Sequence, residues 1–175
     1  MSTTEPAVAP SLKQLALGDL NHELGTTRKL LERVPEEHLD WKPHEKSMTL
    51  GGLALHVATI VYWITRTVQN DSFDIATIRR NPPPTSKQEI LDAFQEKVDE
   101  MRRALESADD AVLMRPWQLR RGEQVLQTMP TLAVIRGMAI SHMIHHRGQL
   151  SVYLRLLNVP LPPMYGPTAD EQPTW

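Results

Sequence analysis

The stretch from Thr131 to Leu157 reads TLAVIRGMAISHMIHHRGQLSVYLRLL and decides the fold. Its large apolar residues recur every three or four positions, which is the spacing of an amphipathic helix. The prolines that follow, Pro160, Pro162 and Pro163, prevent the helix from continuing. We therefore predict one helix over about 131–157.

Three further stretches repeat apolar residues at the same spacing, and each begins at or near a residue that can cap a helix. Ser86, for example, precedes Glu89 by three positions, which is the spacing of a capping box. These stretches cover residues 11–34, 49–69 and 86–107. Together with the first stretch they predict four long helices.

The segments between these helices are long, and the strand signal is confined to Val125 and Leu126, which predict a short strand or hairpin arm. Residues 70–85 are predicted to be loop. The expected fold is therefore all-α, a four-helix bundle with long loops and an irregular C-terminal tail. We expect a flexible leader over residues 1–10 and a single domain over residues 11–175.

Composition excludes several classes of protein. The chain of 175 residues has no cysteine, which rules out disulfides, thiolate metal sites and a cysteine nucleophile. Its 19 basic and 21 acidic residues give a net charge of −2, which argues against nucleic acid as a partner. No apolar run is long enough to cross a membrane. We expect a cytoplasmic protein that binds neither nucleic acid nor membrane.

Three of the seven histidines lie within five residues of the 131–157 helix. His142 and His146 are separated by four positions and His142 and His145 by three, so either pair can share a helix face. On a helical wheel the core direction lies roughly 10° from His146, roughly 45° from His142 and roughly 105° from His145. We therefore prefer His142 and His146 as the inward pair.

His56 lies within the apolar arc of the second helix and can supply a third imidazole. His22 should face outward, and His38 and His44 fall in a charged loop. Three neutral imidazoles suit a divalent metal, and three protein ligands leave an open position of the kind seen at catalytic sites. The alternative is that these histidines only pack in a metal-free bundle. No residue is predicted to be catalytic.

Several motifs resemble one known family. His142-x-x-x-His146-Arg147-Gly148-Gln149 is similar to its signature in the last helix, and Leu53-Ala54-Leu55-His56 to its histidine in the second. Residues 40–43 (DWKP), 46–50 (KSMTL) and 159–167 are similar to its loops and tail. By these residues the chain resembles the DinB-like family of metal-binding four-helix bundles.

The resemblance implies His56, His142 and His146 as ligands of a divalent metal, zinc or nickel. It implies a homodimer, and a small-molecule substrate that can be a low-molecular-weight thiol. The function expected from it is a metal-dependent thiol transferase or hydrolase. The alternative is a non-catalytic stress-response or ligand-binding bundle whose metal is structural.

One position departs from the family pattern. Three residues after Thr49 the family often carries glutamate, and this chain has Gly52. The second half of a capping box is therefore missing, and we expect a looser start to the second helix.

Overall fold

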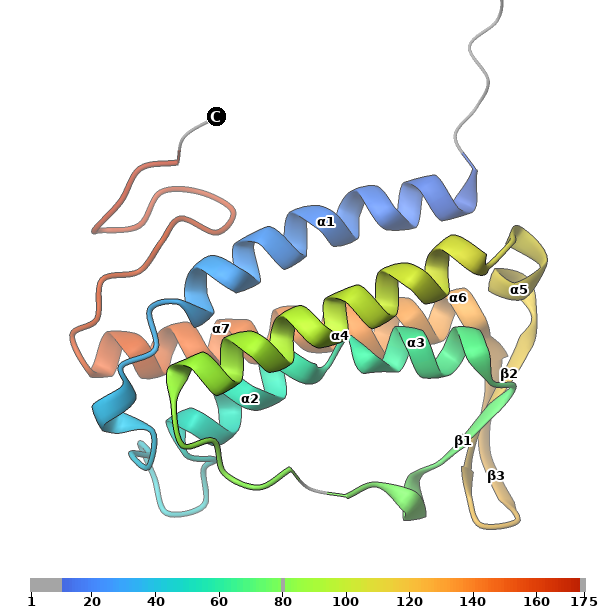
Figure 1. The fold of residues 1–175 in the computed structure, drawn as a ribbon, viewed down its shortest axis with the longest axis horizontal. Coiled ribbons are helices and arrows are strands. Elements are labelled where there is room, and N and C mark those ends of the chain that lie inside the picture. The colour runs from blue at the N-terminus through green and yellow to red at the C-terminus, as the bar shows by residue number, and fades with distance from the viewer. Residues whose placement is uncertain (1–10, 80, 174–175) are drawn as a thin grey trace, which may run out of the picture.

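The structure is a computed structural model that describes residues 11–79 and 81–173 (Figure 1). The expected leader over residues 1–10 lies outside these ranges. The helices are α1 (Leu12–Leu31), α2 (Leu50–Thr59), α3 (Tyr62–Gln69), α4 (Lys87–Ser107), α5 (Asp110–Met114), α6 (Thr131–Val134), the π-helical segment η3 (Ile135–Ser141) and α7 (His142–Leu156), with short 3-10 turns at η1 (Glu36–His38) and η2 (Ile75–Thr77). Four main helical rods form the bundle and lie close to the predicted stretches. They are α1, α2 with α3, α4, and α6 with η3 and α7.

The helix starts follow the predicted capping residues. Ser11 and Gln14 form a reciprocal capping box at α1. At α4 the Ser86 hydroxyl accepts from the Glu89 amide at 3.1 Å. The Glu89 carboxylate, however, accepts from the amide of Thr85 at 2.8 Å, so only half of the predicted box forms with Ser86.

The second predicted helix is broken into α2 and α3, so its continuity was predicted wrongly. At the break the backbone bonds shorten to an i to i−3 pattern, from Trp63 to Ile60 and from Ile64 to Val61. The β-branched residues Thr59, Ile60 and Val61 follow one another here, and such residues lower helix propensity.

The last predicted helix is also interrupted. Between α6 and α7 the seven residues of η3 are π-helical, and the amide of His142 then bonds to the carbonyl of Ala139. A π-helical turn holds more residues than an α-helical turn, so α7 is rotated relative to a continuous helix. The sequence pattern did not predict this segment.

A small three-stranded sheet lies at one end of the bundle (Figure 1). Strands β2 (Pro116–Arg121) and β3 (Gln124–Pro130) form an antiparallel hairpin, which confirms the strand predicted at Val125 and Leu126. Strand β1 (Ser72–Asp74) pairs in parallel with β2 and falls in the predicted loop 70–85. The fold is thus mostly helical, with one small sheet that the sequence only partly predicted.

The core lies between the four rods, and its buried side chains come from all of them. The apolar residues that recur along α4 are buried throughout, at Ile90, Phe94, Val98, Met101 and Leu105. Within the described ranges every helix is too short or too polar to cross a membrane.

The C-terminal tail turns back from α7 toward α1 (Figure 1). Arg33, just beyond the end of α1, pairs with Glu171 at 2.6 Å. In α7, Arg155 pairs with Asp170, and that carboxylate also accepts from the amide of Leu161 at 2.9 Å. The tail predicted to be irregular is therefore held against the bundle by ion pairs.

Candidate metal centre

Three histidines meet where α2 packs against α7. His56 lies in the second half of α2, and His142 and His146 occupy the first turn and a half of α7. One nitrogen from each ring lies within 4.8 Å of the other two. Among the residues that the structure describes, this is the one cluster of three or more His, Asp or Glu side chains close enough to share an ion.

The rings face one another at short range. The centroid of the His56 ring lies 5.2 Å from that of His142 and 4.5 Å from that of His146. The two rings of α7 are 4.6 Å apart, and their Nε2 atoms approach to 2.9 Å. All three side chains are half-buried, so the cluster lies at the edge of the core.

The surroundings of the cluster keep its rings neutral. Burial, followed by the neighbouring rings of His146 and His142, lowers the pKa of His56 to about 4. Burial also lowers the pKa values of His142 and His146. At neutral pH the three rings therefore offer lone pairs, and a metal ion has few protons to displace.

The other histidines lie apart from the cluster. The ring of His145 is 4.9 Å from that of His146, but its side chain is exposed on the shoulder of α7. His22 is exposed, as predicted, and so are His38 and His44 in the loop before α2. Of the two pairs that spacing allowed in α7, His142 and His146 are thus the pair that meets His56.

The start of α2 is held by a cap despite the glycine at position 52. The Thr49 hydroxyl accepts from the amide of Gly52 at 3.1 Å. The amides of Leu50 and Gly51 donate to the carbonyls of Trp41 and Leu39, at 2.7 and 2.9 Å. These bonds tie the preceding loop to the helix that carries His56, so the start is not as loose as the missing glutamate suggested.

Two residues of the motif near the cluster, Arg147 and Gln149, were given no structural role by the sequence analysis. The amide oxygen Oε1 of Gln149 lies 2.7 Å from the Nδ1 atom of His146, where it can accept a hydrogen bond. Arg147 is buried, and its guanidinium pairs with Glu23 of α1 at 2.6 Å. The spacing of the motif gave no reason to place Arg147 inside, because a charged side chain in a helix usually faces solvent.

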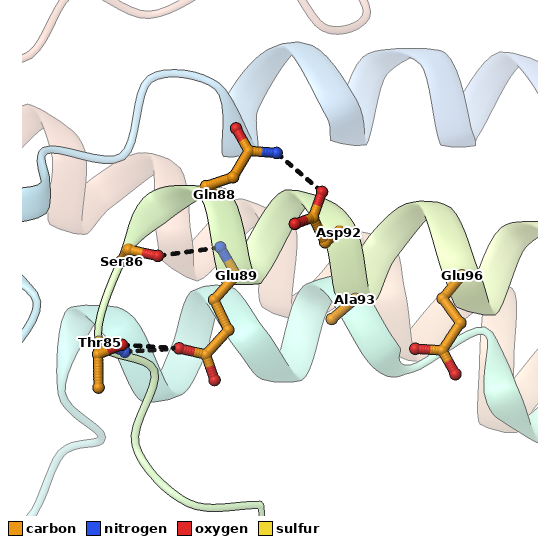
Figure 2. Close-up of a pocket in the computed structure, with 7 residues that line it drawn as sticks. All are labelled: Thr85, Ser86, Gln88, Glu89, Asp92, Ala93 and Glu96. Carbon is orange, nitrogen blue, oxygen red and sulfur yellow. Dashed lines mark hydrogen bonds between the residues drawn. The ribbon is translucent and has the colours of Figure 1, made fainter.

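A hollow at the start of α4 does not offer a comparable site. Figure 2 shows its acidic side chains, Glu89, Asp92 and Glu96. The first two already accept hydrogen bonds, Glu89 from Thr85 and Asp92 from Gln88. None of the three clustered histidines lines this hollow.

Comparison with known proteins agrees with the fold and the motif. The sequence model of the DinB family matches residues 12–174. The chain belongs to the DinB family. The DinB match spans both helices that carry the histidine cluster.

The uncharacterized protein YrdA of Bacillus subtilis is 30% identical over 150 residues, covering 85% of each chain. A crystal structure of a DinB-like protein from Bacillus cereus has a TM-score of 0.70 and 25% identity, and covers 86% of this chain and 95% of that one. The structure of B. subtilis YjoA has a TM-score of 0.68 at 22% identity, covers 87% of this chain and 97% of that one, and supports the fold.

Proposed function

We propose that this DinB family protein binds one divalent metal ion through His56, His142 and His146. We further propose that it uses the ion in thiol transfer or hydrolysis on a small molecule. The observation that carries the proposal is the convergence of three neutral imidazoles, with one nitrogen of each within 4.8 Å of the others. No acidic side chain belongs to this group, so the donors are those that zinc and nickel favour.

The close approach within α7 is the most specific part of this geometry. Two neutral imidazoles whose Nε2 atoms lie 2.9 Å apart either share one hydrogen or face each other with two lone pairs. In the second case a cation between them removes the repulsion. We propose that a divalent metal ion is this cation.

Each histidine of the cluster then has a defined role. His56 holds one side of the site from α2, and the two rings of α7 hold the other. A divalent ion held by three protein ligands keeps a position for water or a thiol and lowers the pKa of that group. Because the cluster is half-buried rather than enclosed by the core, a small substrate can reach it from solvent.

Metal analysis of untagged protein, purified without chelators, tests the first half of the proposal. We expect about one zinc or nickel ion per chain, and none in the double variant His142→Ala/His146→Ala. His145→Ala is the matched control, because it removes an exposed imidazole from the same helix and should leave the metal in place. No metal in the parent protein after incubation with both ions would refute the site.

Activity assays test the second part of the proposal, that the protein catalyses thiol transfer or hydrolysis. A metal-loaded protein should act on electrophiles in the presence of a low-molecular-weight thiol, or hydrolyse them without it, and His56→Ala should abolish the activity while the fold survives. If the loaded protein is inactive and metal removal instead lowers its melting temperature sharply, the ion is structural and the bundle is non-catalytic. Sedimentation of the same sample tests the homodimer that the resemblance to the family implies.

A further inference from the structure

Gln149 lies beside the metal centre without belonging to it. It is exposed on α7, one turn beyond His145 and three residues after His146. Its amide oxygen Oε1 lies 2.7 Å from the Nδ1 atom of the His146 ring. This contact is with the Nδ1 side of the ring, whereas Nε2 of the same ring faces His142.

The hydrogen bond decides which nitrogen of His146 carries the hydrogen. A carbonyl oxygen can only accept, so Nδ1 must be the protonated nitrogen of the neutral ring when Oε1 faces it. The hydrogen is then absent from Nε2, the atom that lies 2.9 Å from Nε2 of His142. This tautomer is the one that a metal ion at Nε2 requires.

His142 also lies beside a backbone group. A hydrogen bond with the backbone of Met138, in the π-helical segment η3, opposes the lowering of the pKa of His142. The Nε2 atom of His142 is the one that faces His146.

We propose that Gln149 is a positioning residue that fixes the Nδ1–H tautomer and the ring orientation of His146, so that Nε2 is free for the metal. The inference rests on the proposed metal site and deepens it. Removal of an acceptor that orients a metal-binding histidine commonly weakens metal binding about 10- to 100-fold.

The absence of the acceptor also creates a competing state. In Gln149→Leu, nothing holds the hydrogen at Nδ1, and the tautomer with Nε2–H donates to Nε2 of His142 across the existing 2.9 Å gap. This internal bond must be broken before an ion can bind. Gln149→Glu keeps an acceptor at the same place and should keep or strengthen metal binding.

Two measurements test the role. Long-range ¹H–¹⁵N correlation spectra of the metal-free protein at neutral pH report the tautomer of His146 directly. Titration with zinc against a competing chelator then gives the affinity. We expect the Nδ1–H tautomer in the parent and in Gln149→Glu, a shift toward Nε2–H in Gln149→Leu, and a 10- to 100-fold loss of zinc affinity in that variant alone.

Gln88→Leu is the matched control, because Gln88 is an exposed glutamine of α4 that bonds to Asp92 and does not touch the cluster. Gln88→Leu should change neither the tautomer of His146 nor the zinc affinity. An Nε2–H tautomer in the parent, or an unchanged tautomer and affinity in Gln149→Leu, would overturn the proposal. The spectra need no metal, so failure of the metal site itself appears separately, as absence of zinc binding in the parent.

Discussion

The guanidinium of Arg147 in α7 pairs with the carboxylate of Glu23 in α1, with Nη2 2.6 Å from Oε2. Both residues are buried, at 1% and 8% exposure. The same guanidinium donates through Nη1 to the carbonyl of Glu23 at 3.0 Å and to the hydroxyl of Thr27 at 3.2 Å. An ion pair with this many bonds joins the helix that carries His142 and His146 to the first helix of the bundle.

Replacement of Arg147 by methionine should therefore be strongly destabilising. The variant leaves the Glu23 carboxylate buried without its cation, and removal of one partner of such a pair typically costs about 3–5 kcal/mol. Urea unfolding should show this loss. In Glu23→Leu/Arg147→Met no buried charge is left unpaired, so the double variant should lose less than the sum of the single variants. A loss in the double variant equal to the sum of the two single losses would show that the pair is not coupled.

Tyr165 extends this ion pair to the C-terminal tail. Its hydroxyl accepts from Nη2 of Arg147 at 2.7 Å and donates to the Glu23 carboxylate at 2.8 Å. Tyr165→Phe removes both bonds and should cost about 1–3 kcal/mol. Amide exchange should become faster in the tail over residues 161–171. Tyr153→Phe is the matched control, because its hydroxyl makes one longer bond, 3.4 Å to the carbonyl of Met48. Equal exchange in both variants would contradict the prediction.

The sequence predicted the parts of the fold that depend on local periodicity. The rods and their caps follow from apolar spacing and from residues such as Ser11 and Ser86. Strand β1 was missed because it has three residues and is defined by pairing with β2, more than 40 positions later in the chain. No local sequence pattern predicts such a long-range pairing.

The burial pattern of α7 was predicted less well, for a geometric reason. A single helical wheel assumes one period from Thr131 to Leu157, but the π-helical segment η3 interrupts that period. The helical wheel placed His146 toward the core, whereas the fully buried residue is the next one, Arg147. A displacement by one position equals about 100° on the wheel. His142 and His146 still meet His56, because both lie on the side toward α2.

Two glycines should respond in opposite ways to the same substitution. A Cβ atom at Gly51 would lie 3.1 Å from the carbonyl oxygen of Leu39 and from Cγ of Pro84, neither of which moves easily. Gly51→Ala should therefore destabilise by about 1–3 kcal/mol. At Gly148 in α7 a Cβ atom meets nothing within 4 Å, so Gly148→Ala should stabilise by up to about 1 kcal/mol. Urea unfolding of the two variants tests whether the free energy of unfolding falls in one and rises in the other. A lower free energy of unfolding in both would contradict the packing argument.

The stability of the metal-free protein should depend on pH through His56. Its pKa is about 4 in the folded chain and 6.5 in the unfolded chain. Above pH 6.5 the ring is neutral in both states and has no effect. Between pH 6.5 and about 4 the unfolded chain binds a proton that the folded chain does not, so the free energy of unfolding falls as the pH falls. His142 and His146, whose pKa values are also lowered, act in the same direction.

Urea unfolding in the presence of a chelator, repeated across this pH range, measures the effect. His56→Gln removes one of the titrating rings and should flatten the profile between pH 6.5 and 4. A direct NMR titration of the His56 ring in the folded parent should give a midpoint near 4. Profiles of equal slope in the two proteins, or a midpoint near 6.5, would show that the cluster does not keep this ring neutral. Added zinc should raise the stability most at the upper end of the range, because protons compete with the metal for the same nitrogens as the pH falls.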